Sequence, residues 1–146
     1  MDFLLESQHI IDINDEIYEL SLMDPSIDYT GRNDYPTIRR KIVELVRMTP
    51  NDSLINIATY YLKFIILLQP FADANHRTAL ISVRLFLYNN GFLLKYTPED
   101  AEKWQKKLYH IRPTYESQET DILTQPKDEI FNHCKKFIED HIIPRL

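Results

Sequence analysis

The chain has 146 residues, enough for one domain that buries a hydrophobic core without a disulfide or a structural metal. Its formal net charge is -5 and no Lys/Arg run exceeds three residues, so nucleic-acid binding is not expected and small molecules or proteins are the expected partners. The single cysteine, Cys134, excludes an internal disulfide, and the first residues lack the basic character of a signal peptide, so we expect a cytoplasmic protein.

Helical periodicity dominates the sequence. The chain contains two glycines and few alternating apolar runs, whereas apolar residues recur every three or four positions. This pattern predicts an all-α fold, a helical bundle formed by a single domain over residues 1–146. The predicted helices cover about residues 4–22, 36–48, 53–68, 75–90, 97–110 and 127–142.

The first predicted helix has an apolar face and an acidic face. Its expected apolar face consists of Ile10, Ile13, Ile17 and Leu20. A polar loop over residues 26–36 follows, and Pro36 suits the first position of the next helix. That helix is expected to end before Thr49-Pro50, because a residue that precedes proline disfavours helical geometry.

The third and fourth predicted helices are the most apolar. Residues 54–68 contain Asn56 and Lys63 and are too few to cross a bilayer, so no membrane association is expected. The helix over residues 75–90 is apolar on most sides, which is typical of a helix in the middle of a bundle. Gly91 suits the left-handed position that ends such a helix.

The C-terminal third carries one further polar cluster. Thr97-Pro98 is typical of a helix cap, and residues 112–121 are expected to form a loop or a short turn. Residues 109–115 bring together one histidine, one arginine and two tyrosines. One hypothesis is that this cluster folds over residues 69–80 and lines a ligand site there; the alternative is an ordinary helix end followed by a polar loop.

Residues 69–80, with the sequence QPFADANHRTAL, combine several groups suited to phosphate. A helix that begins at Asn75 leaves the N–H groups of its first turn without intrahelical partners, and its dipole favours an anion there. Arg77 adds a cation with bidentate geometry, and Asp73 can hold a Mg²⁺ ion that bridges phosphates. Taken singly, each residue is more often a plain helix cap, but their combination predicts an anion site.

This segment resembles the motif of the Fic/Doc family, His-x-Phe-x-(Asp/Glu)-(Gly/Ala)-Asn-(Gly/Lys)-Arg. The residues that match in register are Phe71, Asp73, Ala74, Asn75 and Arg77. Residues 78–80 resemble the Doc (death-on-curing) branch of this family. The resemblance covers about residues 5–95, and residues 96–146 add further helices beyond it.

The resemblance implies an all-α Fic/Doc-like bundle with a central apolar helix after the motif loop. Most members transfer AMP from ATP to a protein hydroxyl (AMPylation), whereas Doc-type members transfer the γ-phosphate and act as toxins neutralised by a partner antitoxin. ATP and Mg²⁺ are the implied co-substrate and cofactor, with Asp73 as the implied metal ligand. The implied phosphate-binding residues are Ala74, Asn75, His76 and Arg77. A target protein and an antitoxin acting in trans are the implied partners.

Two positions depart from the family pattern. Gln69 stands where the family has the catalytic histidine, and a glutamine amide cannot accept a proton near neutral pH. Loss of a general base typically costs about 10² to 10⁴ in rate. His76 stands where AMP-transferring members have glycine and Doc has lysine, and its bulk favours the Doc-like orientation of the nucleotide or no productive orientation.

Two functions therefore remain open. The first is an enzyme that transfers AMP or phosphate to a protein hydroxyl, as the toxin of a toxin–antitoxin pair. The alternative is a catalytically inactive nucleotide-binding or protein-interaction module with the same fold. The family's self-inhibiting motif, Ser/Thr-x-x-x-Glu followed by Gly or Asn, does not occur in the chain, so an inhibitor is expected to act in trans.

Overall fold

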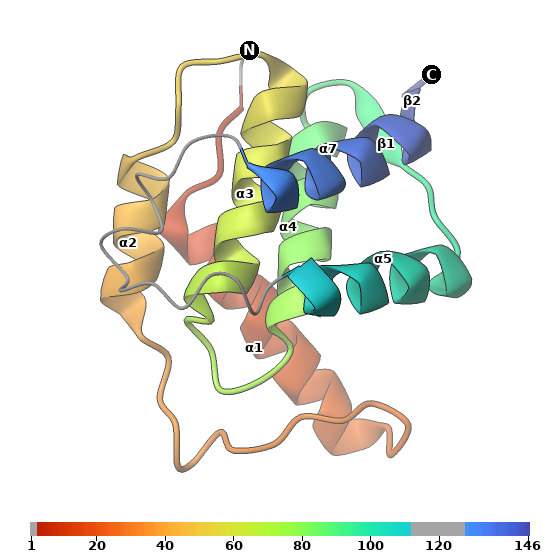
Figure 1. The fold of residues 1–146 in the computed structure, drawn as a ribbon. Coiled ribbons are helices and arrows are strands. Elements are labelled where there is room, and N and C mark those ends of the chain that lie inside the picture. Colours follow the sequence, from red (N-terminus) through yellow and green to blue (C-terminus); the bar gives the residue numbers. More distant parts are fainter. Residues whose placement is uncertain (1–2, 112–127) are drawn as a thin grey trace.

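The computed structural model describes residues 3–111 and 128–146, which form six helices and one two-stranded sheet (Figure 1). The helices are α1 (Ser7–Met23), α2 (Arg39–Arg47), α3 (Leu54–Leu68), α4 (Asn75–Tyr88), α5 (Pro98–Ile111) and α7 (Glu129–His141), and the strands are β1 (Phe92–Leu94) and β2 (Ile142–Pro144). The predicted, mainly helical class is confirmed. The predicted loop at residues 112–121 and the end of the 109–115 cluster lie outside the described residues.

Helices α3 and α4 pack together at the centre of the bundle, α7 packs on α3, and α1 lies across α4 (Figure 1). Every residue from 57 to 66 is buried, so α3 is enclosed on all sides. Helix α4 is enclosed less completely than its apolar composition suggested, because Ile81 and Tyr88 are exposed on one face. No helix in the described part of the chain combines the length and the apolar character that crossing a membrane requires.

Helix α1 begins at Ser7 instead of residue 4 because the preceding segment is bonded to the centre of the bundle. The Leu5 N–H donates to the hydroxyl of Tyr61 at 3.3 Å. The Asn90 side chain accepts the Phe3 N–H at 3.4 Å and donates to the Phe3 carbonyl at 3.0 Å. These contacts hold residues 3–5 outside the helix, and no local sequence signal reports them.

Helix α2 begins at Arg39 instead of Pro36 for a similar reason. The Ile38 N–H donates to the carbonyl of Pro70 at 2.8 Å. This bond joins the end of the loop between α1 and α2 to the loop between α3 and α4. The two loops are therefore bonded to each other just ahead of α2 and α4, the helices that follow them.

The two strands were not predicted from the sequence. They pair antiparallel, with Leu93 opposite Ile143, and the last helix ends at His141 because Ile142 belongs to β2. Each strand has three residues, which are too few for an alternating pattern. Paired residues of the two strands lie about fifty positions apart in the sequence. Gly91 has a φ of 93°, which confirms the predicted left-handed residue after α4.

The start of α5 has the predicted cap at Thr97, and the structure shows that the cap is reciprocal. The Thr97 N–H donates to the Asp100 carboxylate at 3.0 Å, and the Asp100 N–H donates to the Thr97 hydroxyl at 3.1 Å. The hydrogen bond from the Thr97 backbone, with a smaller contribution from its side chain, lowers the pKa of Asp100. The carboxylate therefore remains charged at the positive end of the α5 dipole.

A buried ion pair joins α3 to α7. Lys63 Nζ lies 2.8 Å from Asp128 Oδ2, and the two side chains are 1% and 14% exposed. The other oxygen of Asp128 accepts the Phe131 N–H at 2.8 Å and so caps α7. One carboxylate therefore both neutralises a buried ammonium group and starts the last helix.

Substitution Asp128→Asn should lower the free energy of unfolding by about 3 to 5 kcal/mol, because the Lys63 ammonium would lose its counter-ion while staying buried. Asparagine is also a good helix cap, so the loss reports the charge pair and not the cap. Urea denaturation followed by circular dichroism measures this change.

The matched control is Asp140→Asn, which breaks the exposed pair between Lys136 and Asp140, whose side chains are 75% and 51% exposed. Its effect should stay below about 1 kcal/mol. If the two variants lower the free energy of unfolding by similar amounts, the buried pair does not stabilise the fold more than an exposed pair does.

Candidate functional site

The loop of residues 69–74 joins α3 to α4 and contains two non-glycine residues in the left-handed region. Gln69 has a φ of 45° and Ala74 a φ of 61°. Such a conformation costs roughly 1–2 kcal/mol at each non-glycine residue, so tertiary contacts must hold it. The exposed Gln69, which stands where the Fic/Doc motif has histidine, is the first residue after α3.

Asn75, the first residue of α4, holds the loop through Phe71. Its Oδ1 accepts the Phe71 N–H and its Nδ2 donates to the Phe71 carbonyl, both at 3.1 Å. The Phe71 side chain is buried in the core and so anchors the loop. One Nδ2 hydrogen is used in this contact, so only the second is available to the predicted phosphate ligand.

Asp73 is bonded to the loop between α1 and α2. Its Oδ2 accepts the Thr30 N–H at 2.9 Å and the Thr30 hydroxyl at 3.4 Å, and its Oδ1 accepts the Ala74 N–H at 2.7 Å. A carboxylate has about four lone-pair positions, so these contacts orient the group and leave room for one further ligand. The predicted metal ligand therefore also has a structural role.

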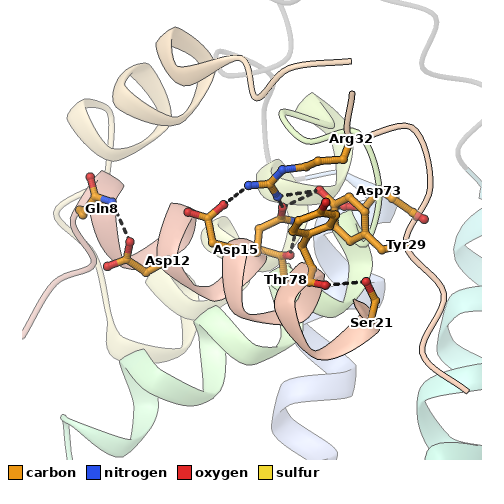
Figure 2. Close-up of polar contacts among 10 residues, drawn as sticks. Gln8, Asp12, Asp15, Ser21, Tyr29, Arg32, Asp73 and Thr78 are labelled. Carbon is orange, nitrogen blue, oxygen red and sulfur yellow. Dashed lines mark hydrogen bonds and ion pairs between the residues drawn. The ribbon is translucent and has the colours of Figure 1, made fainter. Parts of the chain in front are cut away.

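Asn14 of α1 connects both loops to α4. Figure 2 shows its partners Tyr29, Arg32, Asp73 and Thr78 close together beside α1. Its buried Nδ2 donates to the Asp73 carbonyl and to the Thr78 hydroxyl, both at 3.0 Å. Its Oδ1 accepts from the Tyr29 hydroxyl at 2.7 Å and from Arg32 at 3.3 Å. Both hydrogens and both lone pairs of the amide are thus satisfied inside the protein.

Two arginines fasten the loop between α1 and α2 to its neighbours. Arg32 forms an ion pair with Asp15, and its guanidinium carbon lies 4.6 Å from the centre of the Tyr18 ring. Arg77 of α4 donates to the carbonyl of Asp28 at 2.7 Å. The loop is therefore held beside the first turn of α4.

A cavity of about 430 Å³ lies at the start of α4, a volume suited to a small-molecule ligand. All the site residues predicted from the sequence line it: Gln69, Asp73, Ala74, Asn75, His76 and Arg77. Helix α5 adds Gln105 and Tyr109. The sequence offered a ligand site at residues 109–115 as one alternative, but it carried no signal for Gln105.

The start of α4 favours negative charge in this cavity. The first hydrogen bond within the helix runs from the Thr78 N–H to the Ala74 carbonyl at 2.8 Å. Residues 75–77 precede it, so the helix offers no carbonyl to their N–H groups, and the helix dipole adds partial positive charge. The exposed Arg77 guanidinium supplies a full charge beside them.

His76 packs against α5. Its ring centre lies 5.7 Å from that of Tyr109 and 6.5 Å from that of Trp104. The residue thus lies between the first turn of α4 and the aromatic rings of α5.

Asn14 is the main residue that sequence reasoning missed. The buried face of α1 contains Ile10, Asn14 and Ile17, whereas Leu20, expected on the apolar face, is exposed. An asparagine one helical turn from two buried isoleucines was the available signal, because a buried polar side chain needs hydrogen-bond partners.

Comparisons with known proteins return no match: no family model, curated protein or solved structure matches the chain. Within residues 3–111 and 128–146, no group of three or more His, Cys, Asp and Glu side chains is arranged to hold a metal ion. A metal at Asp73 would therefore need oxygen atoms from a ligand. The residues that line the cavity are the basis for a functional proposal.

Substitution Asn14→Ala should lower the free energy of unfolding by about 2 to 4 kcal/mol, because several buried polar groups lose a hydrogen-bond partner at once. Amide hydrogen exchange at residues 73–78 should become faster as well. Chemical denaturation and exchange followed by mass spectrometry measure the two effects.

The control is Gln8→Ala on the same helix, which removes only exposed hydrogen bonds, from Gln8 to Asp12 and from Arg39 to Gln8. Its effect should stay within about 0.5 kcal/mol of zero. If Asn14→Ala has an equally small effect, Asn14 does not organise the site.

Proposed function

We propose that this chain is a Doc-like Fic-domain protein that binds a nucleotide in the cavity at the start of α4. It is, or derives from, an enzyme that transfers AMP or phosphate from ATP to a protein hydroxyl. One observation carries the proposal: the residues that resemble the Fic/Doc motif line a single cavity of about 430 Å³. The Doc-like resemblance further suggests a cytoplasmic toxin restrained by an antitoxin in trans.

The phosphates of the nucleotide belong at the first turn of α4. The N–H groups of residues 75–77 and the helix dipole favour an anion there. Arg77 lines the same cavity, and its single contact to the Asp28 carbonyl leaves further N–H donors for phosphate oxygens. The second Nδ2 hydrogen of Asn75 is a further donor.

Asp73 suits a Mg²⁺ ion bound together with ATP. This metal is usually held by one or two carboxylates, with phosphate oxygens and water completing its coordination, so a larger acidic cluster is not required. The hydrogen bonds from Thr30 and Ala74 fix the carboxylate and leave one lone-pair position. When bound, the ion would neutralise charge on the phosphate groups.

Gln69 limits the proposed reaction. It lines the cavity at the position of the family's base, and its amide can orient a hydroxyl but cannot take its proton. The chain can therefore bind a nucleotide without transferring a group from it. The missing base lowers the rate of transfer but does not affect the affinity for the nucleotide.

The second candidate function is a non-catalytic interaction module with the same fold. It is favoured by the internal contacts of the two central motif residues: Asp73 is bonded to Thr30, and Asn75 is bonded to Phe71. Under this hypothesis the motif maintains the loop, and the cavity binds no nucleotide.

Substitution Arg77→Ala should weaken ATP binding by about 10- to 100-fold, because hydrogen bonds to a charged group contribute about 1.5–3 kcal/mol. Isothermal titration calorimetry with Mg²⁺ measures the affinity. Arg84→Ala is the matched control, since Arg84 is an exposed arginine two turns further along α4 and is not among the cavity residues. Absence of ATP binding by the native chain, or equal losses in both variants, would favour the interaction module.

Substitution Gln69→His should raise group transfer by about 10² to 10⁴ by restoring a general base. Incubation with ATP labelled at either the α- or the γ-phosphate, in the presence of a cell extract, distinguishes transfer of AMP from transfer of phosphate. Gln69→Ala serves as the control without a base and should remain as weak as the native chain. If no variant transfers label, the enzyme hypothesis is wrong.

A further inference from the structure

Helix α5 brings an aromatic ring and a side-chain amide to the cavity that the motif lines. Gln105 and Tyr109 lie one turn apart on α5, and both line the cavity. The adjacent face of α5 supplies Trp104, Leu108 and Ile111 to the core. Tyr109 remains 53% exposed, so the packing of α5 does not require its ring.

The Tyr109 ring is supported from the α4 side. The His76 ring lies 5.7 Å from it between centres, tilted by 37°, and also contacts Trp104. A supported and partly exposed aromatic ring is a suitable surface on which a nucleobase can stack, and stacking contributes about 5- to 150-fold in affinity. The cavity thus has a cationic wall from α4 and an aromatic wall from α5.

We propose that Tyr109 and Gln105 bind the base of the nucleotide whose phosphates lie at the start of α4. This inference rests on the nucleotide-binding function proposed above. Tyr109 stacks on the base, and the Gln105 amide hydrogen-bonds to its edge. A glutamine amide offers one donor and one acceptor side by side, which matches the N6/N7 edge of adenine, whereas guanine presents two acceptors there. The site therefore prefers adenine nucleotides.

The test compares ligands with and without a base. Calorimetry in the presence of Mg²⁺ gives the affinities of the native chain, Tyr109→Ala and Tyr109→Phe for ATP and for inorganic tripolyphosphate. Tyr109→Ala should weaken ATP binding by about 5- to 150-fold and leave tripolyphosphate unchanged. Tyr109→Phe keeps the ring and should bind both ligands like the native chain.

Two further comparisons sharpen the result. Tyr88→Ala removes a tyrosine that is 50% exposed on α4 and is not among the cavity residues, so it should not change ATP affinity. The native chain should bind ATP more tightly than GTP, and Gln105→Leu should reduce this difference. Thermal unfolding of each variant checks that the fold is retained.

The outcomes separate the two proposals. If the native chain binds ATP and tripolyphosphate but Tyr109→Ala weakens neither, or weakens both equally, the base site is wrong while the phosphate site stands. Equal affinity of the native chain for ATP and GTP overturns the role of Gln105. If the native chain binds neither ATP nor tripolyphosphate, the proposed function fails, and the base site fails with it.

Discussion

The buried amide of Asn14 holds together the segments that form the site. Its four hydrogen bonds reach the motif loop, the first turn of α4 and the loop between α1 and α2. Because an unsatisfied polar group is costly in a buried position, these segments can hardly move apart without breaking several bonds together. This constraint also supports the left-handed residue Ala74, which follows Asp73 and whose conformation the loop alone would not favour.

The motif residues divide between maintaining the loop and facing a ligand. Most hydrogen-bonding positions of Asn75 and Asp73 are occupied within the protein. Asn75 bonds to the Phe71 backbone, and Asp73 bonds to Thr30 and to the Ala74 N–H. The groups left for a ligand are the N–H groups of the first turn, the remaining donors of Arg77 and the spare lone pair of Asp73. The proposed nucleotide site thus relies on a preformed backbone more than on many free side chains.

The aromatic wall of the cavity depends on distant parts of the bundle. Helix α5 packs on α7, where the Trp104 ring stacks on His133, and α7 is in turn tied to α3 by the pair of Lys63 and Asp128. The position of Tyr109 therefore follows from contacts at the adjacent, core-facing side of α5. The buried pair of Lys63 and Asp128 belongs to this series of contacts.

The sequence by itself determined what neighbouring residues decide: six helices, the cap at Thr97, the turn at Gly91 and the polar set at residues 69–77. Helical periodicity and capping act over a few residues, so they are visible locally. Only the tertiary structure decided the late starts of α1 and α2, the pairing of β1 with β2, the role of Asn14 and the place of Gln105. Each of these rests on partners far apart in the chain, such as Asn14 and Thr78, 64 residues apart, and long-range contacts leave no periodic trace in the sequence.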